Sequence, residues 1–368
     1  MISVIYSVCY QMMDENMLDN ISKINEIDKS NMLDTLDQFP NQIFEAAEIA
    51  KNAKIETFFK IDNVIITGMG ASGISGDIVS NLYKDKIDVP IFVNKDYDLP
   101  KWARKDTLTI FFSYSGNTEE TISAFKAACQ KKCRVICISS GGKLQELAEK
   151  RQVAYIKIPP GYQPRVAIAY SLFSLIVILS RVGLLKSDID KDINEVIEQV
   201  KEFINLNNKS VPEKNNLSKQ IARKLLNTTP QIFGWGIFSP ISTRWRQQFN
   251  ENSKLISRED VLPESNHNDI VGWSLNPEAS KNFSCIIFRD RSLESMNMTT
   301  RINFLKNLFK GAVANIIEVN PVGKKKLSKV VYTMCLGDYT SCYLAILRNI
   351  DPTPIDIIEQ LKENLKKI

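Results

Sequence analysis

The 368-residue chain contains a single histidine, His267, and only 15 glycines and 14 prolines. This low glycine and proline content excludes a collagen-like or low-complexity chain. The chain also has no large excess of one charge, since it contains 47 Lys and Arg and 42 Asp and Glu. A net charge of +5 is small for this length, so any anion must be held by a local site, and nucleic acid is not an expected partner.

The sequence has few cysteines and lacks a membrane-length apolar run. Its seven cysteines are an odd number in a chain too long for a disulfide-stapled scaffold, which favours a reducing cytoplasm. Cys129, Cys133 and Cys137 run from a helical pattern into a strand-like one, so we expect no metal there. The apolar run 166–180 would span roughly 22 Å as a helix, short of a ~30 Å hydrocarbon core. We expect a buried helix and no membrane partner.

The N-terminal segment MISVIYSVCYQMMDEN lacks a basic region and a small-residue cleavage site. No signal peptide is therefore predicted, and translation could begin at Met1, Met13 or Met17. Residues 1–60 carry acidic and amide-rich helical patterning. They are expected to form a helical N-terminal lead-in.

From Asp62 onward, short apolar runs alternate with helix-length segments. The runs are NVIITGMG, VPIFVNKD, DTLTIFFSYSGN, CRVICISSGG and VAYIKIPPG, and later PQIFGWG, NFSCIIFRD and NIIEVNPVG. This alternation predicts an α/β fold, with parallel sheets flanked by helices on both faces. We predict a first doubly wound subdomain over 61–185, a helical connector over 186–228, and a second subdomain with a C-terminal helix over 229–368.

The segment Gly68-Met-Gly70-Ala-Ser-Gly73 follows a predicted strand and opens a predicted helix. It satisfies the G-x-G-x-x-G pattern of dinucleotide sites. Such a site also has an acidic residue about 20 positions later, whereas Asp96 is 28 positions beyond Gly68. The spacing favours another anion. A turn that needs glycine only for close packing is the structural alternative.

A second polar turn, Ser113-Tyr-Ser115-Gly-Asn-Thr118-Glu-Glu-Thr121, follows the third apolar strand. Hydroxyls and free backbone N–H groups at a helix N-terminus can hold a phosphate. Ser or Thr before Glu is also typical of a capping box, with Thr118 and Thr121 as candidate caps. Two such turns after parallel strands of one sheet favour a binding site, because open α/β sheets bind ligands there.

These motifs closely resemble those of the sugar-isomerase (SIS) domain, through GMGASG, SYSGNTEET, ISSGGKL and QPRVAIAYSL. From about Asp62 the chain is similar to the archaeal-type bifunctional phosphoglucose/phosphomannose isomerase family, through FNENSK, PESNHN, GDYTSCYLA and DPTPIDIIEQLK. The resemblance implies two SIS-type subdomains. It also implies that four hydroxyl side chains hold the sugar phosphate, namely those of Ser72, Ser113, Ser115 and Thr118. The backbone of Gly70 and Ala71 would line the sugar site beside them. Ala71 stands where the family usually has a second glycine.

Aldose–ketose isomerisation requires a base that moves a proton between C1 and C2 through a cis-enediolate, a ring-opening group, and a cation for the enediolate charge. The resemblance implies Glu251 as the base and Arg165 as the cation. By the same resemblance, His267, whose imidazole is the only one in the chain, would assist ring opening from the neighbouring subunit. Lys362 matches the family's ring-opening lysine. Each assignment has a structural alternative. Glu251 would be a surface residue of a helix, Arg165 a surface residue flanking a buried helix, and Lys362 part of a Lys-rich helix end.

The resemblance thus predicts an enzyme that acts on a sugar 6-phosphate, without metal or cofactor, as a homodimer with shared active sites. Two other functions stay open. One is a non-catalytic sugar-phosphate-sensing SIS module, which would keep the phosphate turns and dispense with the base. The other is an NAD-dependent enzyme that uses the glycine-rich turn.

Overall fold

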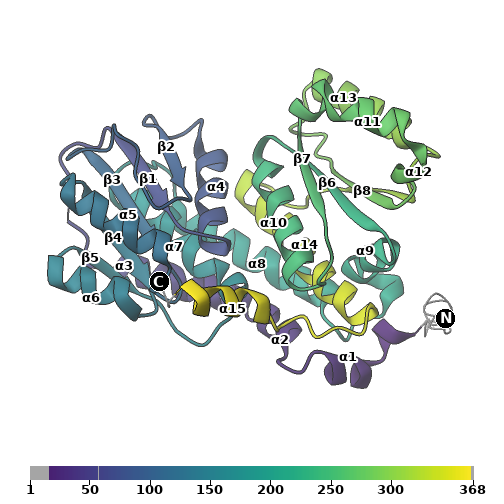
Figure 1. The fold of residues 1–368 in the computed structure, drawn as a ribbon, viewed down its shortest axis with the longest axis horizontal. Coiled ribbons are helices and arrows are strands. Elements are labelled where there is room, and N and C mark those ends of the chain that lie inside the picture. Colours follow the sequence, from purple (N-terminus) through teal and green to yellow (C-terminus); the bar gives the residue numbers. More distant parts are fainter. Residues whose placement is uncertain (1–15, 57, 366–368) are drawn as a thin grey trace.

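The computed structural model describes residues 16–56 and 58–365 of the chain. Met1, Met13 and Cys9 lie outside the described residues, whereas Met17 opens a short 3-10 helix, η1 (Met17–Asp19). Figure 1 shows two α/β domains side by side, with the first helices below them. The predicted fold class is confirmed: two parallel sheets flanked by helices, preceded by N-terminal helices.

The first domain is built on a five-stranded parallel sheet in the order β2-β1-β3-β4-β5. Its strands are β1 (Asn63–Thr67), β2 (Ile91–Asn94), β3 (Thr107–Phe112), β4 (Arg134–Ser139) and β5 (Ala154–Lys157). Its helices are α4 (Ala71–Tyr83), α5 (Glu119–Gln130), α6 (Gly142–Arg151) and α7 (Ile168–Arg181). All five apolar runs predicted in this half form strands, and the run predicted as a buried helix is the buried helix α7.

Both faces of the first sheet are covered, because side chains along a strand alternate between faces. Ile110 and Phe112 of β3 join the core formed with α7 and α4. Phe111 points the other way, where its ring centroid lies 5.6 Å from that of Phe125 on α5. The doubly wound arrangement follows from strands that are apolar on both sides.

The second domain has a four-stranded parallel sheet in the order β7-β6-β8-β9. Its strands are β6 (Thr229–Trp235), β7 (Arg258–Leu262), β8 (Phe283–Phe288) and β9 (Asn315–Val319). Its helices are α10 (Ser239–Glu251), α11 (Asp269–Leu275), α12 (Pro277–Ser280), α13 (Met296–Phe309), α14 (Lys326–Leu347) and α15 (Asp356–Leu365). Short 3-10 helices η4 (Gly236–Phe238) and η5 (Glu264–His267) precede α10 and α11.

Strand β7 was not among the predicted strands. Its sequence, Arg-Glu-Asp-Val-Leu, carries three charged residues, and only Leu262 is buried. It is an edge strand that pairs with β6 from Gln231↔Arg258 to Trp235↔Leu262. Strand formation there depends on that tertiary pairing rather than on an apolar pattern, which is why the sequence does not reveal it.

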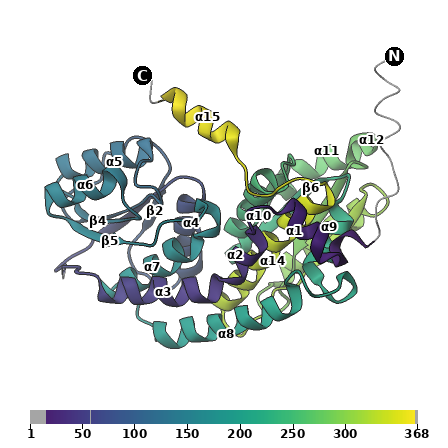
Figure 2. The same cartoon turned by 90° about the horizontal axis from the view of Figure 1, so that it is seen from below.

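Helices α1 (Ile21–Ile27), α2 (Met32–Asp37) and α3 (Phe39–Asn52) form the lead-in, and α8 (Ile189–Asn207) and α9 (Leu217–Leu225) lie in the connector. Helix α3 packs on α7 of the first domain, and α8 contacts both α3 and α14. Figure 2 shows α8 running along both domains. Helix α14 is apolar enough to cross a membrane, but 94% of that window is buried inside the protein, as expected for a core helix.

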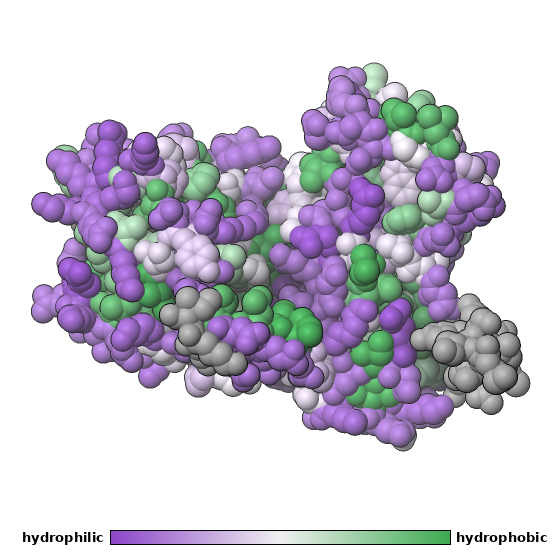
Figure 3. All heavy atoms as spheres, viewed as in Figure 1, coloured by the Kyte–Doolittle hydropathy of each residue, from purple (hydrophilic) through white to green (hydrophobic). Residues whose placement is uncertain are grey.

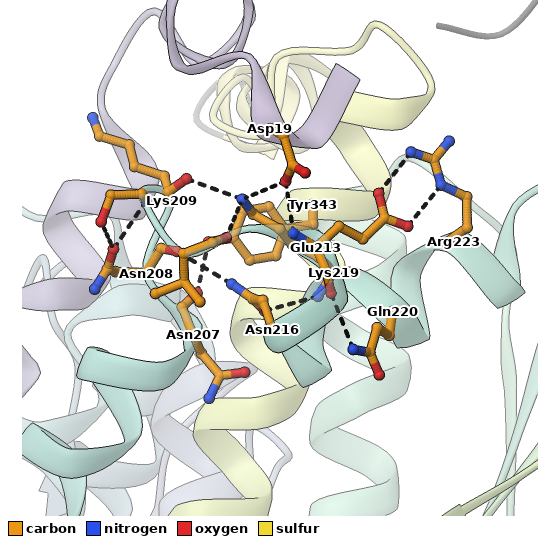
Figure 4. A network of polar contacts seen from close by, with 12 residues as sticks. Asp19, Asn207, Asn208, Lys209, Glu213, Asn216, Lys219, Gln220, Arg223 and Tyr343 are labelled. Carbon is orange, nitrogen blue, oxygen red and sulfur yellow. Dashed lines mark hydrogen bonds and ion pairs between the residues drawn. The ribbon is translucent and has the colours of Figure 1, made fainter. Parts of the chain in front are cut away.

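A fully buried lysine, Lys219 of α9, joins the lead-in, the connector and α14 (Figure 4). Its Nζ donates to the carbonyl oxygens of Lys209 at 3.0 Å and Val211 at 2.6 Å. The ammonium also lies 3.6 Å from Asp19 Oδ1 and 5.5 Å from the ring centroid of Tyr343. Burial lowers the pKa of Lys219, and these partners offset the cost of burying its charge.

Candidate active site

The glycine-rich turn joins the carboxyl end of β1 to the N-terminus of α4. Gly70 has φ +52°, and a Cβ at Gly73 would lie 2.5 Å from the carbonyl oxygen of Gly68, so the turn needs glycine at both positions. The N–H groups of Ser72 and Gly73 donate back to the carbonyl oxygen of Met69. The N–H groups of Gly70 and Ala71 precede them and donate to no backbone carbonyl among residues 16–56 and 58–365, so they are open to an anion.

The second polar turn joins the carboxyl end of β3 to α5. Ser113 Oγ and Thr118 Oγ1 are 2.8 Å apart, and Ser115 Oγ accepts a hydrogen bond from the Asn117 N–H. Thr118 occupies the N-cap position, but its side chain makes no capping hydrogen bond. Thr121 is buried inside α5 and is not a cap. The capping-box alternative is therefore wrong, and the hydroxyls face one another instead.

The two turns are neighbours because β1 and β3 are paired along their whole length, from Asn63↔Thr107 to Thr67↔Phe111. Ser72 is 7% exposed at the start of α4. The residues that end and follow β2 are Asn94 and Lys95, and Lys95 pairs with Asp77 of α4. A dinucleotide site would need an acidic residue at this strand end. The arrangement suits a phosphate and disfavours NAD.

Arg165 lies in η2 (Pro164–Val166), between β5 and α7, and is 1% exposed. It is not the surface arginine of the alternative interpretation. Its Nε donates to Asn252 Oδ1 at 2.6 Å, and its Nη2 donates to the carbonyl oxygens of Pro352 at 2.9 Å and Thr353 at 2.7 Å. Nη1 is buried and has no hydrogen-bond partner among the described residues. Burial lowers the pKa of Arg165, and Glu251 opposes that effect.

Glu251 is the last residue of α10, and its side chain is 27% exposed. Its Oε2 lies 3.7 Å from Nη1 of Arg165. Helix α10 packs against α4, which carries the glycine-rich turn. The structure thus brings Arg165 of the first domain and Glu251 of the second domain together at the boundary of the two domains.

Four polar residues around this pair were not singled out from the sequence. Arg244 and Asp338 form a buried ion pair at 2.9 Å, and Arg244 Nη2 also donates to the carbonyl oxygen of Arg165 at 2.5 Å. Asn252, next to Glu251, donates to Ser341 Oγ of α14. The fourth, Lys254, follows α10. The FNENSK motif contains Asn252 and Lys254, and GDYTSCYLA contains Asp338, so these motifs held a signal for those three. Arg244 and Asp338 are 94 positions apart, and no local pattern links them.

His267 and Lys362 lie on elements other than those that carry Arg165 and Glu251. His267 ends η5 between β7 and α11 and is exposed. Lys362 lies on α15, whose residues are mostly exposed, and Figure 2 shows α15 standing away from both sheets. In the described residues, no hydrogen bond or ion pair joins either side chain to Arg165 or Glu251.

Comparison with known proteins supports this description. Residues 57–185 match the SIS domain model, and residues 214–365 match the model of the bacterial phospho-glucose isomerase C-terminal SIS domain. Among solved structures, a hypothetical protein from Thermus thermophilus superposes with a TM-score of 0.71 at 12% identity, covering 96% of each chain. That likeness concerns the fold alone.

Curated relatives are closer in sequence. A bifunctional phosphoglucose/phosphomannose isomerase of Caldicellulosiruptor bescii is 38% identical over 92% of this chain and 99% of its own. One of Aquifex aeolicus is 34% identical over 89% of this chain and 96% of its own. The family resemblance of the motifs is thereby confirmed. The chain belongs to the bifunctional phosphoglucose/phosphomannose isomerase family.

Proposed function

We propose that this chain interconverts glucose 6-phosphate and mannose 6-phosphate with fructose 6-phosphate through a cis-enediolate. The observation that carries the proposal is the buried guanidinium of Arg165. Its Nη1 has no hydrogen-bond partner among the described residues and lies 3.7 Å from the carboxylate of Glu251. Relatives at 38% and 34% identity that are named as this enzyme support it.

The two polar turns would hold the phosphate. The hydroxyls of Ser72, Ser113, Ser115 and Thr118 and the N–H groups of Gly70 and Ala71 are the donors. Ser113 and Thr118 share one hydrogen bond, which leaves one of the two hydroxyl hydrogens for a phosphate oxygen. Neutral donors at the start of α4 and α5 would bind the dianion and still let the product leave.

Glu251 would move the proton between C1 and C2, because its carboxylate is partly exposed and so accessible to substrate. Arg165 would stabilise the enediolate oxygens through Nη1. Its Nε and Nη2 already donate to Asn252 and to the carbonyl oxygens of the 352–353 backbone. A guanidinium already held in place needs no reorganisation during the reaction.

Ring opening is assigned to His267 and Lys362 as the family resemblance implies, with His267 entering the site of a second subunit. The surface around His267 supports a homodimer: Val271 and Leu275 on α11 and Phe304 on α13 are 58%, 77% and 57% exposed. Figure 3 shows apolar atoms over these helices at the outer end of the second domain. Two copies could bury this surface while they share active sites.

We also expect a cytoplasmic location, since the cysteines of the described residues are all free thiols: Cys129, Cys133, Cys137, Cys285, Cys335 and Cys342.

A direct test supplies fructose 6-phosphate and detects glucose 6-phosphate and mannose 6-phosphate separately. Wild type should form both, and Glu251→Gln should bind substrate but lose turnover by roughly 100-fold or more. Glu198→Gln on the exposed part of α8 is the control. Full activity in Glu251→Gln would rule out the assigned base. Saturable binding without product in the wild type would instead indicate the sugar-phosphate-sensing module.

A further inference from the structure

The C-terminal strap, residues 351–355, is held by two cations from different domains. Lys254 Nζ donates to the carbonyl oxygen of Pro352 at 2.9 Å. Arg165 Nη2 donates to the same oxygen at 2.9 Å and to the carbonyl oxygen of Thr353 at 2.7 Å. One backbone carbonyl of the strap therefore joins a residue of the first domain to a residue of the second.

Lys254 also closes the end of the helix that carries Glu251. Its Nζ lies 2.5 Å from the carbonyl oxygen of Glu251 and 3.4 Å from that of Asn252. These carbonyls at the end of α10 have no partner within the helix and carry partial negative charge, so a cation is favourable there. Lys254 has φ +50°, a conformation that glycine adopts at lower cost. A lysine in this position points to a use for the side chain.

The strap leads directly into α15, which has no buried residue of its own. Ile357 and Leu361 on this helix are 75% and 59% exposed. Packing of its own side chains therefore does not fix α15, whereas Pro352 of the strap is buried. Within the described part of the chain, Arg165 donates to the carbonyl oxygens of Pro352 and Thr353, and Lys254 donates to that of Pro352. These bonds hold the strap from which α15 begins.

We propose that Lys254 is a positioning residue, which holds the end of α10 and the strap so that Glu251 and Arg165 Nη1 keep their relative positions. The inference rests on the proposed function, since it assigns catalysis to those two groups. Lys254 itself touches backbone carbonyls and not the reacting atoms. Its loss would let the strap and the last turn of α10 shift, and a shift of about 1 Å at a catalytic pair can cost on the order of 100-fold in rate.

The test compares Lys254→Met with Lys254→Arg. Lys254→Met should lower kcat about 10- to 100-fold while KM changes less than about threefold, because the phosphate turns are untouched. Lys254→Arg, which keeps a cationic donor, should recover most of kcat. Lys201→Met, on the exposed surface of α8, is the matched control and should behave as wild type.

A second readout is independent of activity. Amide hydrogen exchange over residues 351–365 should be faster in Lys254→Met than in wild type and close to wild type in Lys254→Arg. Unchanged kcat in Lys254→Met, or unchanged exchange in the strap, would overturn the proposal. If wild type converts no sugar phosphate, the proposed function fails, and the exchange experiment still decides whether Lys254 fixes the strap. If Lys254→Met does not fold, the comparison is made between wild type and Lys254→Arg. A folded Lys254→Arg whose kcat is about 10- to 100-fold below that of wild type would then overturn the proposal.

Discussion

Nη1 of Arg165 lies 3.7 Å from Oε2 of Glu251, and the two residues come from different domains. Arg165 is 1% exposed, yet Nη1 has no hydrogen-bond partner among the described residues. Leaving a buried donor unpaired costs free energy. An enediolate oxygen bound beside Glu251 would satisfy that donor, so the stabilisation would be realised during the reaction.

Arg165→Lys should lower kcat by roughly 100-fold, because an ammonium cannot serve Asn252, the strap and the enediolate together. Steady-state kinetics with fructose 6-phosphate measure the effect. Arg151→Lys, at an exposed position of α6, is the control. A kcat within about twofold of wild type would mean that the guanidinium is not the enediolate cation.

Ser113→Ala should act on binding rather than on turnover. It removes a hydroxyl from the pair with Thr118, and one lost hydrogen bond to a charged group costs about 1.5 kcal/mol, or roughly tenfold in KM. Inhibition by inorganic phosphate should weaken in parallel. Ser210→Ala in an exposed loop should change neither quantity. An unchanged KM in Ser113→Ala would remove Ser113 from the phosphate site.

The proposed entry of His267 into the active site of a second subunit predicts complementation between two inactive variants. In a mixed dimer of Glu251→Gln and His267→Ala, one site carries both substitutions and the other carries neither. Random mixing of equal amounts should therefore restore about a quarter of wild-type activity. The measurement is activity after the two variants are dissociated and reassociated. If each variant is inactive alone and the mixture stays inactive, His267 does not act in the partner's site.

Lys254 makes stability depend on pH in a defined window. Burial of its ammonium, and then the charge of Arg165, lower the pKa of Lys254 to about 8, while Asp351 and Glu251 oppose this. The ordinary value is 10.5. Between these two values the unfolded chain holds a proton that the folded chain has released. The contribution of Lys254 to the free energy of unfolding therefore rises with pH across this window and is lost as pH falls through about 8.

Chemical denaturation of wild type and Lys254→Met at several pH values tests this dependence. The difference in free energy of unfolding should move in favour of wild type between about pH 8 and 10.5. A flat difference would show that the ammonium titrates alike in the folded and unfolded chains. Lys201→Met should show no such dependence.

The local parts of the fold and the conformation of the two polar turns were predictable. Apolar runs that end in turn residues predicted strands such as β1, β3 and β8, and these strands lie where the runs are. The glycine-rich turn was predictable because glycine conformation and helix N-termini are local properties. Strand β7 was missed, since its charged sequence becomes a strand only through pairing with β6.

The sequence by itself determined the two α/β halves, the polar turns at the strand ends and the family, because each depends on residues close together in the chain. Only the tertiary structure decided that Arg165 meets Glu251, that Arg244, paired with Asp338, donates to the backbone carbonyl of Arg165, and that one strap carbonyl binds both Arg165 and Lys254. These contacts join residues far apart in sequence. Their geometry follows from how two folded domains pack, and no periodicity or spacing within the chain encodes that packing locally.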